Sequence, residues 1–180
     1  MSEFIAMPPS LDSSVPLRPG DVVLAMTPVP GDPATTLNFI GRARSMHASA
    51  QTAPKNPAEA RSRTRERGDA AWLEIDAPFR PGLVGLSDFS HIIVLGWLHQ
   101  ARRDLIQITR PSDTAPKGVF ALRSPVRPNP VSVSMARILS VDVSTGRIEI
   151  DAIDLLDGTP LVDLKPYRPG IDAVPDAVVP

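Results

Sequence analysis

Apolar residues in this chain form short runs or alternate strictly with polar residues, and both patterns are typical of β-strands. The segment 91–99 is apolar on both faces, which predicts a strand that is buried at its centre. The segment 131–143 alternates apolar and polar residues and predicts a second long strand, with Arg137 as an interruption. The same patterns predict further strands at 21–26, 36–44, 70–75, 105–109, 118–122, 147–153 and 161–165.

The connections between these segments are rich in turn-forming residues. Ser144-Thr145-Gly146 separates two strand candidates by only three residues, so we expect these strands to pair antiparallel as a hairpin. No long amphipathic helix is evident. Many short strands with frequent turns predict an all-β fold, a barrel or a sandwich, with short helical or loop insertions.

Composition bounds the class of protein. A chain of 180 residues with 42% hydrophobic residues suits one domain with a sizeable core, preceded by an N-terminal extension over 1–35 that is partly extended. The absence of cysteine excludes disulfides and thiolate zinc sites, and three scattered histidines argue against a metal site. Neither a signal peptide nor a membrane span is visible, so we expect a soluble, cytoplasmic protein without a metal.

Charge is unevenly distributed although the formal net charge is only −1. From Arg42 to Arg137 there are fifteen Lys and Arg against eight Asp and Glu, whereas the segment 142–180 has three against eight. Four arginines alternate at positions 61, 63, 65 and 67, in a mobile loop or a short helix after Pro57. They are either a solvated basic segment or a contact to nucleic-acid phosphates.

The loop within 118–130, with the sequence GVFALRSPVRPNP, is the first candidate for a functional site. Three prolines stiffen its second half, and Arg123, Arg127 and Asn129 are polar groups that such a loop can present between two strands. A structural proline corner with two solvated arginines is the alternative. The usual sequence fingerprints of dinucleotide-binding enzymes, NTPases, zinc proteases and serine hydrolases are absent.

Three segments resemble the signature sequences of a known family. They are GLVGLSDFSH at 82–91, the loop segment 118–130, and DLLDGTPLVDLKPY at 154–167. They are similar to the TsaA-like, or TrmO-type, family of S-adenosylmethionine-dependent tRNA methyltransferases, which methylate the N6 nitrogen of threonylcarbamoyladenosine next to the anticodon. The resemblance implies a small single-domain β-barrel over 36–175, with a tail at 176–180. It also implies S-adenosylmethionine as cofactor, tRNA as partner, and a homodimer.

The resemblance also implies roles for individual residues. The expected cofactor-binding residues are Pro57, Ala58, Glu59, His99, Gln100, Arg123, Val133, Asp151, Ala152, Ile153 and Asp154. Arg123 suits the carboxylate of the cofactor's amino-acid tail, and Asp151 or Asp154 suits its cationic part. Candidates for removing the proton of the acceptor nitrogen are Asp157, Asp163 and Tyr167, and candidates for binding the substrate are Arg127, Asn129 and Lys165.

The chain departs from the family pattern in three places, one of which is Pro54-Lys55-Asn56, where Pro-Arg-Gln is usual. Val126 stands where a histidine or an aromatic residue is common, and Ser132 stands where glycine is common. Two alternatives therefore remain beside a tRNA methyltransferase. One is a methyltransferase that acts on another RNA or on a small molecule, and the other is a non-catalytic module that binds an adenosyl ligand or RNA.

Overall fold

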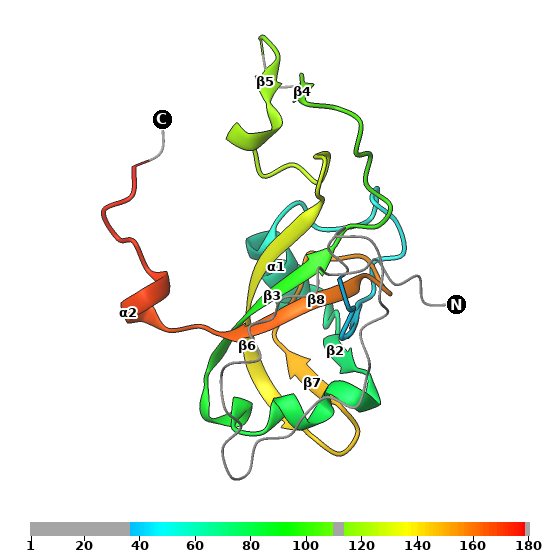
Figure 1. Cartoon of the computed structure of the whole chain (residues 1–180), viewed down its shortest axis with the longest axis vertical. Helices are drawn as coiled ribbons and strands as arrows, with labels where there is room; N and C mark the ends of the chain where they lie inside the picture. Colours follow the sequence, from blue (N-terminus) through cyan, green and yellow to red (C-terminus); the bar gives the residue numbers. More distant parts are fainter. Residues whose placement is uncertain (1–36, 110–113, 179–180) are drawn as a thin grey trace, which may run out of the picture.

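Six antiparallel strands close into a barrel in the computed structural model, which describes residues 37–109 and 114–178 (Figure 1). In barrel order the strands are β1 (Gly41–Arg44), β2 (Ala71–Ile75), β7 (Arg147–Ile150), β6 (Val131–Asp142), β3 (His91–Trp97) and β8 (Pro160–Pro166). The closed barrel confirms the predicted all-β class and leaves no open edge among these six strands. The strand predicted at 21–26 lies outside the described residues.

Strand β3 is central to the barrel because it pairs with both β6 and β8. Its inward residues Ile92 and Val94 are fully buried, and they lie opposite Ala136 and Ser134 of β6. Large residues on one strand thus face small ones on the next, which is how a narrow barrel fills its interior. The predicted strand 91–99 ends earlier than expected, at Trp97.

The alternation along β6 predicts a strand correctly, but its larger apolar residues do not fill the core. Ser134 and Ala136 are the buried positions, while Val133 and Met135 are 41% and 42% exposed. Leu139, further along the strand, is 59% exposed. A period of two separates the two faces of a strand without saying which face is inside.

The predicted hairpin joins β6 to β7 through Gly146, which has φ 78°. A Cβ at Gly146 would lie 2.3 Å from the carbonyl oxygen of Ile75, so glycine is required for both conformation and space. The Asp142 carboxylate accepts hydrogen bonds from Ser144 Oγ at 2.6 Å and Ser144 N at 2.9 Å. These bonds, with those from Thr145, lower the pKa of Asp142 to about 2.

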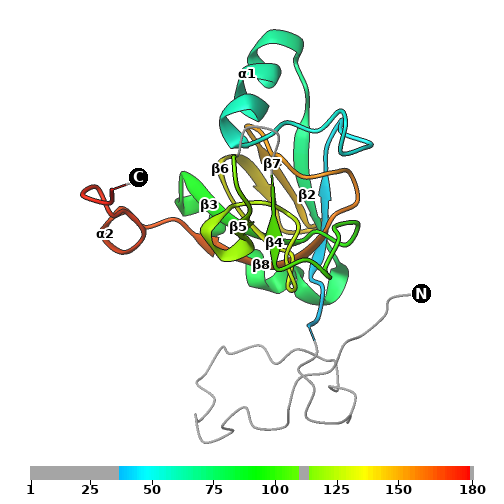
Figure 2. The same cartoon turned by 90° about the horizontal axis from the view of Figure 1, so that it is seen from above.

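The basic segment forms the helix α1 (Pro57–Arg67), one of the two structures that its sequence allowed. Asn56 Oδ1 accepts a hydrogen bond from the Glu59 amide at 2.9 Å, and Pro57 occupies the first turn, where its missing N–H costs nothing. Gly68, with φ 72°, ends the helix in the left-handed conformation. Figure 2 shows α1 standing out from the body of the barrel.

The strand predicted at 118–122 is wrong. Only β5 (Lys117–Gly118) is extended, pairing with β4 (Gln107–Ile108) in a separate two-stranded arm, and the 3-10 turn η3 (Val119–Ala121) follows. Val119 is fully buried whereas Phe120 is 79% exposed. The apolar run therefore buries Val119 alone instead of continuing as a strand. The two-stranded arm lies away from the barrel (Figure 1).

The remaining short helices are η1 (Ala77–Leu83), η2 (Leu86–Asp88) and α2 (Pro169–Asp172). Arg80 fixes η1 beside the β6–β7 hairpin by donating to the carbonyls of Ile75 at 3.1 Å and Ser144 at 3.0 Å. Over 37–109 and 114–178, no helix has the length and apolar character that a membrane crossing requires.

Candidate functional site

A cavity of about 690 Å³ opens at one end of the barrel. Five separate segments contribute residues to its lining. They lie within 50–57 before and at the start of α1, 98–102 after β3, 123–127 in the proline-rich loop (the proline loop, 118–130), 131–134 at the start of β6, and 154–159 between β7 and β8. Because β3 is antiparallel to both β6 and β8, the end of β3 and the starts of its neighbours meet at this point. The volume and its mixed polar and apolar lining are typical of a small-molecule site.

Arg127 holds the proline loop in place from within. Its guanidinium donates to the carbonyls of Ser124 at 2.9 Å and Val119 at 3.1 Å, and also to that of Leu122. Val126 adds a turn contact from its amide to Ser124 Oγ at 3.2 Å. These contacts brace the loop from within, and the Arg127 side chain also lines the cavity.

Arg123 lies on the same loop but is exposed. It donates from Nη2 to the carbonyl of Val133 at 3.0 Å, which places its guanidinium over the start of β6 at the cavity wall. A guanidinium uses five N–H donors, so Arg123 keeps capacity for an anionic ligand group.

Asp154 contributes the carboxylate of the cavity lining. Its Oδ1 accepts a 2.6 Å hydrogen bond from Ser134 Oγ, and Ser134 is only 3% exposed. Among the described residues that line the cavity, Asp154 is the single acidic side chain, whereas Lys55, Arg102, Arg123 and Arg127 are cationic. The cavity thus presents groups of both charges.

Arg102 is paired outside the cavity by Asp104, with two hydrogen bonds of 2.7 Å and 2.8 Å. The hydrogen bond and the charge of Asp104 raise the pKa of Arg102, and Arg102 lowers the pKa of Asp104 in return. His99 and Gln100, which follow β3, are exposed at the cavity and lie 3.4 Å apart between Nε2 atoms.

The segment before α1 enters the cavity more fully than expected. The residues of this segment that line the cavity are Ala50 and 53–57, whereas Ala58 and Glu59 lie outside the lining. The Glu59 carboxylate instead accepts from the Lys55 amide at 3.0 Å and from Arg63 Nη2 at 2.5 Å. The Lys55 amide is the main cause that lowers the pKa of Glu59, followed by the hydrogen bond from Arg63.

The structure brings seven of the predicted site residues together and leaves ten outside the lining. Those in the lining are Pro57, His99, Gln100, Arg123, Arg127, Val133 and Asp154. Those outside it are Ala58, Glu59, Asn129, Asp151, Ala152, Ile153, Asp157, Asp163, Lys165 and Tyr167.

Several of the residues outside the lining have structural partners. Asp151 accepts from Arg61 Nε at 2.9 Å and from the Arg137 amide at 2.7 Å, and so joins α1 to the barrel. Asp163 and Lys165 form an ion pair of 2.7 Å on β8. That pair raises the pKa of Lys165.

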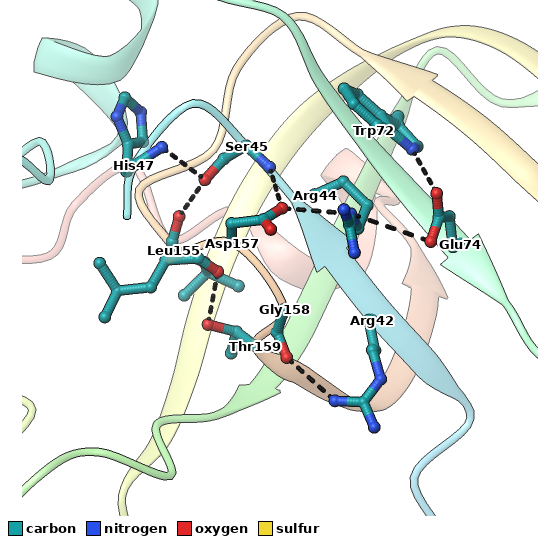
Figure 3. A network of polar contacts seen from close by, with 11 residues as sticks. Arg42, Arg44, Ser45, His47, Trp72, Glu74, Leu155, Asp157, Gly158 and Thr159 are labelled. Atoms are coloured by element: carbon teal, nitrogen blue, oxygen red, sulfur yellow. Dashed lines mark hydrogen bonds and ion pairs between the residues drawn. The ribbon is translucent and has the colours of Figure 1, made fainter. Parts of the chain in front are cut away.

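The turn at 154–160 is tied to the end of β1 by a network of polar contacts (Figure 3). Asp157 Oδ1 accepts from the Ser45 amide at 3.2 Å and forms an ion pair with Arg44 Nε at 3.1 Å. Ser45 Oγ donates to the Leu155 carbonyl at 2.8 Å, and the Asp157 amide donates to the His47 carbonyl at 2.9 Å. These contacts give Asp157 structural partners at the end of β1.

Sequence reasoning missed several residues of the cavity. Ser134 and Thr159 are buried polar residues at its floor, and Thr159 Oγ1 donates to the Leu156 carbonyl at 2.7 Å. Ser134 is a polar residue within a predicted strand, and the alternation of that strand does not show that its small residues face inward. For Lys55 and Arg102, nothing in the sequence except their charge indicates a place in the cavity lining.

The fold and this cavity define a small barrel protein whose cavity is lined by groups of both charges. Residues 42–173 match the tRNA-methyltransferase O N-terminal domain family, TrmO_N, and the chain belongs to this family. The family membership expected from the three signature segments is therefore confirmed.

Some relatives are named as S-adenosylmethionine-binding proteins, and others are named as methyltransferases. VirR of Rhizobium radiobacter, a "Probable S-adenosyl-L-methionine-binding protein", is 36% identical over 155 residues, which are 86% of this chain and 82% of that protein. A protein of the same description from Archaeoglobus fulgidus is 40% identical over 69% of this chain, but the match covers only 34% of that relative. The tRNA (adenine(37)-N6)-methyltransferase of Escherichia coli is 34% identical over 77% of this chain and 60% of its own.

Solved structures agree with the fold. A crystal structure of TrmO has a TM-score of 0.63 and 36% identity, covering 79% of this chain and 62% of that one. TrmO from Pseudomonas aeruginosa gives a TM-score of 0.59 at 34% identity, with coverage of 79% and 60%. The present chain thus spans somewhat less than two thirds of these TrmO chains.

Proposed function

We propose that this protein binds S-adenosylmethionine in the 690 Å³ cavity and transfers its methyl group to the N6 nitrogen of threonylcarbamoyladenosine, next to the anticodon of tRNA. The observation that supports it most is the convergence of the proline loop, the end of β3 and the Asp154 turn on one cavity. Two of the three segments that resemble the family, 118–130 and 154–167, supply residues to its lining.

The lining fits the chemical groups of S-adenosylmethionine. Its amino-acid tail carries a carboxylate, for which the exposed guanidinium of Arg123 is a partner, and an ammonium group and a sulfonium, for which Asp154 is one. The apolar atoms of Val133, Leu155 and Leu156 offer a surface for the adenine ring.

Bound S-adenosylmethionine supplies a methyl group whose bond to sulfur breaks as the bond to nitrogen forms, leaving a neutral thioether. The chain's own task is to hold donor and acceptor in line, because positioning alone contributes much of the rate in such a displacement. Arg127 keeps the loop in one conformation through its carbonyl contacts, so the loop loses little entropy on binding.

The proton of the acceptor nitrogen must leave, and the candidates selected from the sequence for accepting it are Asp157, Asp163 and Tyr167. Within one copy of the chain these residues lie outside the cavity lining. His99 and Asp154, which do line it, are therefore added as proton-acceptor candidates.

The Escherichia coli relative, named as a tRNA methyltransferase, supports tRNA as the substrate. A second candidate function is supported by VirR, which matches this chain over more of its own length and is named for binding alone. In that case the barrel would bind the cofactor without transferring its methyl group to tRNA. Methylation of another RNA or of a small molecule remains the third possibility, since Val126 lines the cavity where the family often has a ring.

We also propose that the protein is a homodimer. The outward face of β6 carries Val133, Met135 and Leu139 at 41%, 42% and 59% exposure, with Arg137 between the last two, and exposed apolar side chains on one strand face favour an interface. Light scattering of the wild type and of Met135→Glu tests this: the wild type should have the mass of two chains and the variant a lower mass. A wild type with the mass of one chain would contradict the proposal.

Isothermal titration calorimetry with S-adenosylmethionine tests the cofactor. We expect binding by the wild type and at least tenfold weaker binding by Arg123→Ala, with Arg168→Ala, at the residue before α2, as the control. Folded protein that gives no heat at millimolar ligand would contradict the proposal. Transfer of labelled methyl to tRNA then separates the enzyme from the binding module, since cofactor binding without transfer supports only the latter.

A further inference from the structure

Helix α1 is polar around its whole circumference, and Ala60 is its single buried residue. A helix of 11 residues without an apolar stripe gains little from packing and depends on its caps and polar contacts. Four of its side chains are arginines, and the structure divides them into two groups.

The first group anchors the helix. Arg61 forms the 2.9 Å ion pair with Asp151 and donates from Nη2 to the Met135 carbonyl at 2.5 Å, so it fastens α1 to β6 and to the loop after β7. Arg63 pairs with Glu59 one turn earlier and donates to the Thr52 carbonyl, both at 2.5 Å. These two arginines are half-buried and are occupied within the protein.

The second group, Arg65 and Arg67, is exposed in the last turn. Within 37–109 and 114–178 no carboxylate pairs with either guanidinium; the nearest acid in sequence, Glu66, accepts from Ser62 Oγ at 2.9 Å. Arg65 also borders a small cavity of about 110 Å³ against Arg61, Thr64 and Asp151. Two guanidinium groups without a carboxylate partner among the described residues thus lie in the last turn of a helix that is fixed to the barrel. Because they are two residues apart, they point to different sides of that helix.

The helix connects these groups to the candidate site. Pro57, its first residue, lines the 690 Å³ cavity. At about 1.5 Å per residue, Arg65 and Arg67 lie about 12 and 15 Å along the helix from Pro57. Cationic residues therefore continue from the cavity, through Lys55 at its rim, to the far end of α1.

We propose that Arg65 and Arg67 form a docking surface for the phosphate backbone of the RNA whose nucleotide enters the cavity. Guanidinium groups bind phosphate oxygens through charge-assisted, often bidentate, hydrogen bonds. A macromolecular substrate continues beyond its reacting base, and a rigid helix beginning at the cavity fixes where that backbone is held. This inference rests on the proposed RNA substrate.

A structural role is the competing explanation, because arginines in the last turn also interact favourably with the helix dipole. Such a role affects the thermal stability of α1 and leaves RNA affinity and its salt dependence unchanged. The two explanations therefore differ in what is measured.

The test compares Arg65→Ala/Arg67→Ala with the wild type in binding a fluorescently labelled anticodon stem-loop RNA over a range of salt concentrations. We expect about tenfold weaker binding at low salt from the loss of two exposed charge contacts. The slope of log K against log salt should become shallower by about 1.4 to 1.8, since each phosphate contact contributes about 0.7 to 0.9. Arg65→Lys/Arg67→Lys should recover most of the affinity.

Arg168→Glu, at the residue before α2, is the matched control, because it changes the net charge by the same amount outside α1 and should leave the salt slope unchanged. Affinity for S-adenosylmethionine should be equal in all variants, which shows that the barrel is intact. If the double alanine variant binds RNA as the wild type does, this inference is overturned while the proposed function stands. If the wild type binds S-adenosylmethionine but no RNA, the proposed tRNA substrate fails as well.

Discussion

Ser134 Oγ, on a residue that is only 3% exposed, donates a 2.6 Å hydrogen bond to Oδ1 of Asp154. This contact joins the interior of β6 to the loop after β7 at the floor of the cavity. It fixes the orientation of the one acidic side chain among the described residues that line the cavity. The pair is therefore a direct means of testing the site.

Ser134→Ala should weaken binding of S-adenosylmethionine about tenfold, because a hydrogen bond to a charged group contributes about 1.5 to 3 kcal/mol. Calorimetry measures the dissociation constant, and Ser140→Ala, at an exposed position of the same strand, is the control. An unchanged dissociation constant for Ser134→Ala would show that Asp154 does not depend on this bond for ligand binding.

Arg127→Ala should lower the free energy of unfolding by about 1 to 3 kcal/mol, since its carbonyl contacts brace the loop. Arg127→Lys should recover little, because an ammonium group cannot reproduce the planar fork of a guanidinium. Urea denaturation provides the measurement. Full recovery by lysine would mean that charge matters here and geometry does not.

Asp157→Asn distinguishes a structural from a catalytic role for Asp157. The variant keeps an acceptor for the Ser45 amide but loses the ion pair with Arg44, so we expect a loss of about 0.5 to 1 kcal/mol in stability. Cofactor affinity and methyl transfer should remain near wild type when measured well below the melting temperature. A large loss of transfer rate with unchanged stability would support the catalytic assignment instead.

Protonation of the buried His47 makes the stability of the fold depend on pH. Burial lowers the pKa of its imidazole below the ordinary value of 6.5, with Arg63 acting in the same direction and Asp69 opposing it. The unfolded chain therefore binds a proton more readily than the folded one, and His47 destabilises the fold as pH decreases below about 6.5.

Urea denaturation of His47→Gln and the wild type between pH 5 and pH 8, a range of about three units around the ordinary pKa of histidine, checks this. We expect the variant to lose part of the pH dependence, whereas His91→Gln, at an exposed position, should retain it. Parallel curves for His47→Gln and the wild type would contradict the assignment to His47.

The sequence predicted the strands of the barrel better than the elements of the arm. Strands β3, β6 and β7 form where periodicity indicates them, because their inward residues meet a common core. The run at 118–122 has the same apolar character but no neighbouring sheet to continue, so after Gly118 it becomes a 3-10 turn with Phe120 in solvent.

For the candidate site, the sequence located the segments but not the direction of each side chain. Arg123, Asp154 and the His99-Gln100 pair could be selected because motif and residue type coincide there. Ser134 could not, since alternation along β6 does not reveal that its smaller residues face inward.

By itself, the sequence determined the all-β class, the antiparallel hairpin at Gly146 and the family, because these depend on local pattern and on short motifs. Only the tertiary structure decided which charged groups have a partner within the protein. Arg61 meets Asp151, and Ser134 meets Asp154, only after the barrel has closed and brought distant segments together. Closure satisfies Arg61 within the protein and leaves Arg65, four residues later, facing solvent, and no local pattern separates the two.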